Sequence, residues 1–469
     1  MLLKISINLG NNIKIFIMNK IDFKNLKKQC ANNIDFLNGH KFTNDQIFTF
    51  VFKIESPYSI NNILNNSNIY KKDPICFLNK DFQSIGLVKE KEFIFSNSNE
   101  FDSKQSSILK LISNTKFLNN KCNLDKTFIF GGYNFNVDQK NIGIWNSIPN
   151  GVFTLPRYIF LKSHLIINLF LATNCKDVSS NIILQYVEDL RLIFKNSIID
   201  KQSSIEKIED INKDKYLHNL ENSINDINDK NNKLDKLVLS RIKKVSYKDD
   251  VSRRSILNNL YYRNKKNMNF LFSYNDNKCI IGSSPELVIS LNNNIIKSES
   301  LAGSNYNKHE DKFISDTKEL NEQKIVTNYI LQYFNNNATN IAFNRVPFVK
   351  KSSNIDHLCS EITGVINVSK NIFNFLNELH PTPAIAGEPK KYAINYIKKN
   401  ENRGWYGGPI GWVDNNLNGK FYLNIRSGLI VNNNIYLYSG SGITDKSKSI
   451  KEWNETEQKF NLMVKACDE

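Results

Sequence analysis

Short apolar runs in the second half of the chain alternate with turns rich in asparagine and aspartate. Phe270 to Tyr274 and Cys279 to Gly282 flank the polar turn Asn275-Asp276-Asn277-Lys278. Two further pairs of runs have the same arrangement: Leu287 to Leu291 with Ile295 to Lys297, and Lys420 to Leu429 with Ile435 to Ser439. Runs of this length separated by turn residues are typical of β-hairpins. The pattern therefore predicts three antiparallel hairpins.

Three longer segments show a helical spacing of apolar residues. Glu319 to Phe334 predicts a helix that places apolar side chains on one face, and Glu452 to Val464 predicts a closing helix. Ile205 to Leu234 keeps isoleucine and leucine three or four positions apart without proline or glycine, which predicts an amphipathic helix. Hairpins combined with helices favour an α+β fold with a mainly antiparallel sheet.

The N-terminal half contains apolar runs such as Phe48 to Ile54, but no chemical motif. We interpret residues 18–230 as a scaffold that covers the pocket, and residues 231–469 as the region that carries the chemistry. Residues 1–17 are interpreted as a possible N-terminal extension, because Met18 opens a second and more polar start. A chain of 469 residues is expected to form one elaborate domain or two closely joined ones.

Composition argues against several classes of protein. Apolar residues make up 41% and charged residues 23%, as in ordinary globular proteins. No apolar run approaches the roughly 18–20 residues that span a bilayer, so no membrane partner is expected. The seven cysteines are scattered and form no Cys-x-x-Cys pair. They indicate reduced, mostly buried thiols in a cytoplasmic protein rather than a disulfide framework.

The net charge of +16 raises the question of nucleic-acid binding. Lysine, asparagine and isoleucine are spread over the whole chain, including loops such as Asn292 to Asn294. The basic residues form no stripe, and this composition is typical of a protein encoded by an AT-rich genome. No nucleic-acid partner is expected, and a basic nucleic-acid-binding protein is kept as a remote alternative. A basic surface would still help to attract a small dianionic substrate.

Several polar residues of the second half have both a chemical and a purely structural interpretation. Glu286 follows Ser283-Ser284-Pro285 at a strand start, where most glutamates are solvated. Glu455 and Lys459 lie four positions apart on one helix face, as in many surface ion pairs. Gly440-Ser441-Gly442 fits a tight turn as well as a ligand-binding loop. Taken singly, each feature favours the structural alternative.

The joint occurrence of ten ordered segments changes this balance, because together they resemble the chorismate-utilising enzymes and, within them, the isochorismate synthases. The segments read KLVLSR (236–241), GSSPELV (282–288), SESLAGS (298–304), DTKELNEQKIV (316–326), HLCSEITG (357–364), LHPTPAIAGEP (379–389), RGWYGGPIGW (403–412), FYLNIRSGLI (421–430), SGSGIT (439–444) and EWNETEQK (452–459). The resemblance covers about Asp235 to the C-terminus, and the N-terminal half matches only diffusely. It implies an α+β fold with two large, mainly antiparallel β-sheets packed together and helices on the outside.

The resemblance also implies an activity and two catalytic residues. Formation of isochorismate adds water at ring carbon C2 of chorismate while the C4 hydroxyl leaves, which requires a base and an acid. By resemblance, Lys236 is the general base and Glu286 is the general acid. The lysine must lose its proton before it can act and the glutamate must keep one, so their environments must differ.

By the same resemblance, Mg²⁺ is the cofactor, and Glu322 and Glu455 are its ligands from two helices. Glu319 and Glu452 lie one helical turn earlier and are easily mistaken for ligands; either is a candidate for supporting the ligands from behind. The residues implied in chorismate binding are Gly303, Ser304, His380, Ala384, Ile385, Arg426, Gly440, Gly442, Ile443 and Lys459. For His380, a histidine that only fixes its loop is an open alternative, and His357 is not expected to contact substrate.

Lys236 and Ala384 favour one activity within the family. Lys236 favours water as the nucleophile, because relatives that use ammonia usually lack this lysine. Salicylate synthases keep the lysine but typically carry threonine at the position of Ala384, so salicylate synthase is the alternative and isochorismate synthase the preferred interpretation. Chorismate is the expected partner, and menaquinone biosynthesis is the preferred pathway over siderophore or salicylate formation. The protein is expected to be a monomer or a weak dimer.

Overall fold

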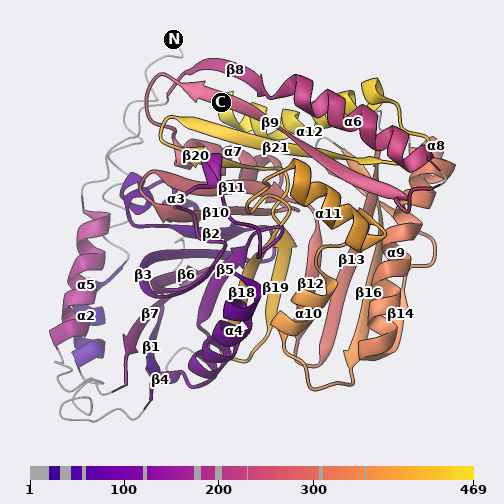
Figure 1. Cartoon of the computed structure of the whole chain (residues 1–469). Coiled ribbons are helices and arrows are strands. Elements are labelled where there is room, and N and C mark those ends of the chain that lie inside the picture. The colour runs from indigo at the N-terminus through magenta and orange to yellow at the C-terminus, as the bar shows by residue number, and fades with distance from the viewer. Residues whose placement is uncertain are drawn as a thin grey trace.

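The computed structural model describes residues 21–31, 44–54, 60–119, 124–173, 181–195, 203–229, 231–305, 310–352 and 355–468. Within these ranges, paired strands form the interior and helices lie around them (Figure 1). None of the helices in these ranges is long and apolar enough to cross a membrane. The extension predicted at residues 1–17 lies outside the described residues.

All strands in the described part of the chain belong to one network of hydrogen-bonded ladders. Every pairing is antiparallel except that of β1 with β4, which is parallel. The strands are β1 (Gln46–Lys53), β2 (Ile75–Leu78), β3 (Gln83–Phe95), β4 (Lys116–Asn119), β5 (Phe128–Tyr133), β6 (Gly151–Leu161), β7 (His164–Leu171), β8 (Ile205–Ile211), β9 (Lys236–Tyr247), β10 (Met268–Asn275), β11 (Lys278–Ser284), β12 (Leu287–Asn292), β13 (Ile295–Asn305), β14 (Ala338–Phe343), β15 (Phe348–Lys350), β16 (Asp356–Ile366), β17 (Gly387–Glu388), β18 (Pro409–Asp414), β19 (Gly419–Leu423), β20 (Ser427–Val431) and β21 (Asn434–Ile443).

The network divides into two arms at the long strand β6. The first part of β6 pairs with β5 and its last part pairs with β7, while β3 follows the whole opposite edge. The first arm continues through β2, β10, β11, β20, β21 and β9, and the second through β5, β18, β19, β12, β13 and β16. At the fork, the buried Asn168 amide donates to the Pro156 carbonyl and accepts a hydrogen bond from the Thr49 hydroxyl. The predicted α+β fold with two mainly antiparallel sheets is confirmed, and the two sheets are joined as arms of one network.

Helices cover the outer faces of both arms (Figure 1). Helices α9, α10 and α11 lie along the second arm and β9, while α7 and α12 pack against β11 and β21 of the first. The helices are α2 (Phe23–Ala31), α3 (Ile60–Leu64), α4 (Ser98–Ser113), α5 (Asn181–Phe194), α6 (Lys213–Asn228), α7 (Arg253–Arg263), α8 (Glu310–Ile314), α9 (Thr317–Asn337), α10 (Ile372–Leu379), α11 (Lys390–Asn400) and α12 (Ser449–Asp468), with 3₁₀ turns at η2 (Ser67–Lys71) and η3 (Gly143–Trp145).

An aromatic cluster fills the space between the two arms. Phe77 of β2 stacks on Phe130 of β5 with ring centres 5.6 Å apart, and meets the Trp412 ring of β18 edge-on at 5.3 Å. Offset and edge-on ring pairs stabilise a core by about 0.5–1.5 kcal/mol each beyond the burial of their area. The five cysteines within the described residues are free and buried, as predicted. Cys122 and Cys175 lie outside those residues.

Most of the predicted elements of the second half are confirmed. The first two hairpins are β10 with β11 and β12 with β13, and the two helices are α9 and α12. The single helix predicted over Ile205 to Leu234 is wrong in its first part, which forms strand β8. This segment pairs along the free edge of β9, and Asn212, with φ at +53°, redirects the chain before α6 begins.

The single strand predicted over Lys420 to Leu429 is also wrong, because it is divided into β19 and β20. Strand β19 pairs with β12 and β18 of the second arm, whereas β20 pairs with β11 and β21 of the first. The chain therefore crosses between the arms at residues 424–426. Arg426 adopts a left-handed conformation there, with φ at +51°. The hairpin partner of β21 is β20 alone.

Candidate active site

A cavity lies where the two arms meet helices α9 and α12. It includes about 670 Å³ of space that no atom fills, counting its open mouth. Most residues implied by the resemblance line this cavity: Glu286, Gly303, Ser304, Glu322, Ala384, Ile385, Arg426, Gly440, Gly442, Glu455 and Lys459. Residues that are far apart in the sequence are thus brought together around one space. The lining combines a few charged groups with apolar side chains, as in small-molecule sites.

Lys236 lies directly behind the wall of this cavity. It is the first residue of β9, and its side chain is fully buried. Its Nζ donates a 2.8 Å hydrogen bond to Oε1 of Glu322, which extends from α9. Burial raises the pKa of the Glu322 carboxyl, but the charge and hydrogen bond of Lys236 favour the carboxylate, and the pKa is lowered overall. Gly442 gives this pair room, because a Cβ there would lie 2.7 Å from Glu322 Oε1 and would push this carboxylate away.

Glu286 occupies the short loop between β11 and β12 and is only 6% exposed. Its backbone N–H donates to the Ser284 hydroxyl over 3.3 Å, and its carbonyl accepts a 3.1 Å hydrogen bond from the Leu423 N–H. Burial raises the pKa of its carboxyl to about 8. The group therefore keeps its proton at neutral pH, which is the state that a general acid requires.

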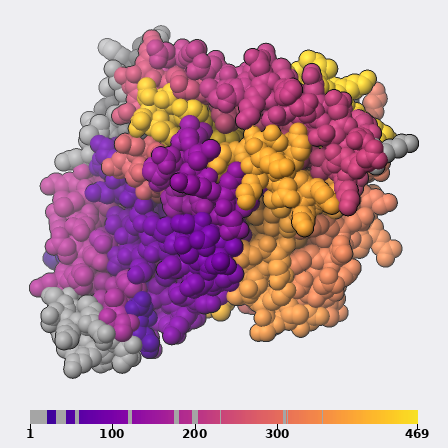
Figure 2. All heavy atoms as spheres, viewed as in Figure 1, coloured from indigo at the N-terminus to yellow at the C-terminus, as the bar shows by residue number. Residues whose placement is uncertain are grey.

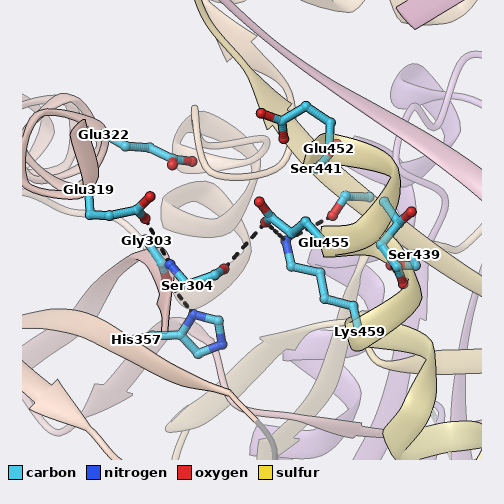
Figure 3. Close-up of polar contacts among 12 residues, drawn as sticks. Gly303, Ser304, Glu319, Glu322, His357, Ser439, Ser441, Glu452, Glu455 and Lys459 are labelled. Atoms are coloured by element: carbon cyan, nitrogen blue, oxygen red, sulfur yellow. Dashed lines mark hydrogen bonds and ion pairs between the residues drawn. The ribbon is translucent and has the colours of Figure 1, made fainter. Parts of the chain in front are cut away.

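Four glutamates from α9 and α12 gather at one end of the cavity (Figure 3). Glu319 accepts a 2.9 Å hydrogen bond from the Ser304 N–H, and Glu455 accepts a 3.3 Å bond from the Ser304 hydroxyl. Burial, together with the neighbouring carboxylates, raises the pKa of Glu319 to about 7 and also raises that of Glu452. One oxygen of Glu452 is buried without a hydrogen-bond partner in the described part of the chain. Beyond burial, the raised pKa values reflect repulsion among these carboxylates, which a bound cation would relieve.

The donor atoms at this end suit a hard divalent cation. No group of three or more His, Cys, Asp or Glu side chains in the described ranges could hold a metal ion by itself. Mg²⁺ does not need such a group, because it usually keeps several waters and takes one or two carboxylates together with oxygen atoms of the substrate. Glu322 and Glu455 face the same space from two helices (Figure 3). The residues present therefore fit a magnesium ion.

Two cationic side chains line the cavity. Lys459 lies 2.6 Å from Glu455 and donates a 2.9 Å hydrogen bond to the Gly440 carbonyl. Arg426 Nη2 lies 3.2 Å from His357 Nε2, and His357 Nδ1 lies 2.7 Å from the Gly303 carbonyl. A guanidinium can only donate, so Nε2 accepts and Nδ1 carries the hydrogen that Gly303 receives. Burial and then the Arg426 charge lower the pKa of His357 well below its usual value, which keeps the ring neutral.

The side chains of His380 and Ile443 do not line this cavity. Ile443 is fully buried in the core at the end of β21. His380 lies beside a different hollow, with its Nε2 3.3 Å from the Phe135 carbonyl, and burial lowers its pKa to about 3. This placement supports the alternative in which His380 fixes its loop, and its contact with substrate stays a prediction.

Sequence reasoning missed His357 and Tyr406 as wall residues. His357 lies on the cavity wall and contacts Arg426. The expectation that it does not contact substrate stays a prediction. Both residues belong to segments that carry the resemblance, HLCSEITG and RGWYGGPIGW. The signal was present, but the direction of each side chain depends on pairings between distant strands.

Comparisons with known proteins find similar chains. A family model described as chorismate binding enzyme matches residues 30–468. The isochorismate synthase MenF of Bacillus subtilis is 29% identical over 355 residues, which cover 72% of this chain and 74% of that protein. The solved structure of MenF from Escherichia coli, described as a menaquinone-specific isochorismate synthase, covers 94% of this chain and 99% of its own, with a TM-score of 0.75 at 19% identity. Anthranilate synthase component I from Streptococcus pneumoniae covers 84% and 91%, with a TM-score of 0.64 at 18% identity. The two solved structures support the fold.

Proposed function

Because the chain belongs to the family of chorismate-binding enzymes, we propose that it is an isochorismate synthase, an isomerase that converts chorismate to isochorismate. The observation that carries this proposal is the placement of a lysine and a protonated carboxyl at one cavity. Lys236 donates a hydrogen bond to Glu322, which lines the cavity, and Glu286 also lines the cavity. The reaction needs one group that takes a proton and one that donates it.

In the proposed reaction, Lys236 takes a proton from a water molecule as the water oxygen bonds to C2 of the ring. The ring double bonds shift, the C4–O bond breaks, and Glu286 donates its proton to the departing hydroxyl, which leaves as water. One water is added and one is released, so substrate and product are isomers. Proton exchange with solvent then restores the acid form of Glu286 and removes the proton from Lys236. In the structure the Lys236 charge pairs with Glu322, so Lys236 can act as a base only after it has lost this proton.

Two anchors hold the substrate in this proposal. Arg426 binds one carboxylate of chorismate through its forked guanidinium, and Lys459 binds the other beside the Gly440 carbonyl. The hydrogen bond between Arg426 and the neutral His357 helps to keep the guanidinium directed along the wall. Ala384 and Ile385 provide an apolar surface for the ring.

Glu322 and Glu455 would hold Mg²⁺ in this proposal, with Glu319 and Glu452 behind them. When bound, the ion supplies positive charge that offsets the repulsion between the substrate carboxylate and these glutamates. In the structure, Glu322 pairs with Lys236 and Glu455 pairs with Lys459. Each glutamate must therefore leave its lysine before it can bind the ion.

We propose menaquinone biosynthesis as the pathway, because the 29% identical Bacillus subtilis relative is named MenF, as is the menaquinone-specific enzyme of Escherichia coli. A cytoplasmic location and a monomeric or weakly dimeric state are part of the same proposal. Light scattering of the purified protein measures the oligomeric state directly.

Incubation of the purified protein with chorismate and Mg²⁺, followed by chromatography of the products, tests the proposed function. Isochorismate is the expected main product. Salicylate and pyruvate as main products would instead identify a salicylate synthase. No turnover, combined with salt-sensitive binding of DNA or RNA, would favour the nucleic-acid alternative.

Replacing Glu455 by glutamine should raise the Mg²⁺ concentration needed for half-maximal activity by about tenfold or more, because one anionic ligand is lost. Calorimetric titration with Mg²⁺ should show a matching loss of affinity. The matched control is Glu361→Gln, which removes a 42% exposed carboxylate on β16 that pairs with Lys297. An unchanged metal titration of the Glu455 variant would remove this residue from the ligand set.

A further inference from the structure

Lys350 connects three separate parts of the second arm beside the cavity. It is the last residue of β15, and its Nζ donates a 2.6 Å hydrogen bond to Glu299 of β13. The same Nζ donates a 2.8 Å bond to the carbonyl of Pro285, the residue before Glu286. Strand β16 separates β13 from β15, so the lysine side chain reaches across a whole strand to make these contacts.

This contact acts on the backbone that carries Glu286. The peptide group between Pro285 and Glu286 is planar, so a donor that holds the Pro285 carbonyl also orients the Glu286 N–H. That N–H is bonded to Ser284, and the Glu286 carbonyl is bonded to Leu423. The Glu286 carboxyl itself has no hydrogen-bond partner among the residues that the structure describes. Its position therefore depends on how its backbone is held.

The Lys350–Glu299 pair also brings charge close to Glu286. Lys350 is 28% exposed and Glu299 is 11% exposed, so solvent screens this charge only in part. The other titratable or charged groups facing Glu286 are Lys236 of β9, Arg426 at the crossing between the arms, Tyr406, and His357 and Cys359 of β16. After burial, the charges of Lys350 and Glu299 affect the pKa of the Glu286 carboxyl most. Lys350 lowers this pKa and Glu299 raises it.

We propose that Lys350, held by Glu299, is a positioning residue that orients Glu286 and whose partly neutralised charge sets the pH at which this acid loses its proton. This inference rests on the proposed function, because it concerns the acid of the proposed reaction. Lys350 also lines a hollow on the far side of Pro285 and His357. Since the side chain is partly exposed there, a substitution does not open a sealed core.

The test is the pH dependence of kcat/KM in two variants with opposite charge changes. Glu286 is active when protonated, so activity falls as pH rises through its pKa. Lys350→Met removes a positive charge, which should move the alkaline limb up by about half a pH unit and lower kcat/KM roughly tenfold through lost positioning. Glu299→Gln leaves the lysine charge uncompensated and should move the limb down by about half a unit.

Two controls separate charge and positioning from a general structural effect. Lys350→Arg keeps the charge and a donor, and should restore most of the wild-type profile. Lys351→Met removes the neighbouring lysine, which is 63% exposed and pairs with Glu310, and should leave the profile unchanged. Shifts in the same direction in Lys350→Met and Glu299→Gln, or no shift in either, would overturn the proposal.

A second measurement does not depend on turnover. Carbon NMR of protein labelled at glutamate carboxyls, with Glu286→Gln used to assign the signal, reports the titration of Glu286 directly. Opposite displacements of this titration in Lys350→Met and Glu299→Gln support the inference, and identical titrations in both variants and wild type contradict it. Absence of isochorismate from the wild-type reaction would instead reject the proposed function, while the NMR titration would still test the influence of the pair.

Discussion

Replacement of Lys236 by alanine should reduce isochorismate formation by about 10²–10⁴-fold, because the proposed base for water is removed. The side chain is fully buried, and its Nζ has Glu322 as a partner at 2.8 Å. The substrate anchors Arg426 and Lys459 are untouched, so chorismate binding should persist. Product chromatography measures the first effect, and calorimetry with chorismate measures the second.

The Lys236 experiment has a matched control on the same strand. Lys244 of β9 is 25% exposed and lies 3.7 Å from Glu209 of β8, outside the cavity. Lys244→Ala should therefore keep normal turnover. Normal turnover in Lys236→Ala would rule out its role as the base. A loss of both turnover and binding would point to a collapsed site. Lys236→Met keeps nearly the original side-chain volume, so it would distinguish a collapsed site from the loss of the amine.

Replacement of Glu286 by glutamine should also lower kcat by about 10²–10⁴-fold, because glutamine has no acidic proton to donate. In wild type, burial raises the pKa of this carboxyl to about 8, so activity should be present below pH 8 and should fall as the pH rises through that value. A pH profile of kcat/KM measures this limb. Full activity in the glutamine variant would exclude Glu286 as the acid.

Stability separates this catalytic effect from a folding defect. The folded-state pKa of Glu286 lies above the unfolded value of about 4.3, so the unfolded chain binds fewer protons at this site between these values. The stabilising contribution is complete below the unfolded pKa and is lost as the pH rises through the folded one. Glutamine stays neutral, so Glu286→Gln should melt at the same temperature as wild type or higher at pH 7–9. A lower melting temperature would show that the side chain supports the fold in another way.

Local patterns were sufficient to predict the hairpins β10–β11 and β12–β13, because an apolar run and its turn lie within a few residues. They were not sufficient where a strand pairs with a distant one. Ile205 to Ile211 has a spacing that also suits a helix, and only the free edge of β9 decides that it is a strand. In the same way, the break between β19 and β20 reflects a crossing between two arms that no local pattern encodes.

The candidate site shows the same division between local and distant information. The resemblance indicated Glu286, Glu322 and Glu455, and the structure places them around one cavity. Single residues would not have indicated this, since each has an ordinary structural explanation. Lys350 and Glu299 belong to strands separated by β16, and Lys350 lies outside the segments that carry the resemblance. Their contact near Glu286 was therefore accessible only from the three-dimensional structure.

The fork at β6 has a consequence for any attempt to divide this protein. Strand β2 lies between β3 and β10, and β5 lies between β6 and β18, so each arm joins strands of the N-terminal half to strands of the C-terminal half. A fragment that contained only residues 231–469 would leave the backbone groups of β10 and β18 without these neighbours. Unpaired strand edges of this kind form hydrogen bonds with strands of other molecules. Truncation near residue 230 should therefore yield an aggregating polypeptide, and transplanting the chemistry to another scaffold would require both halves.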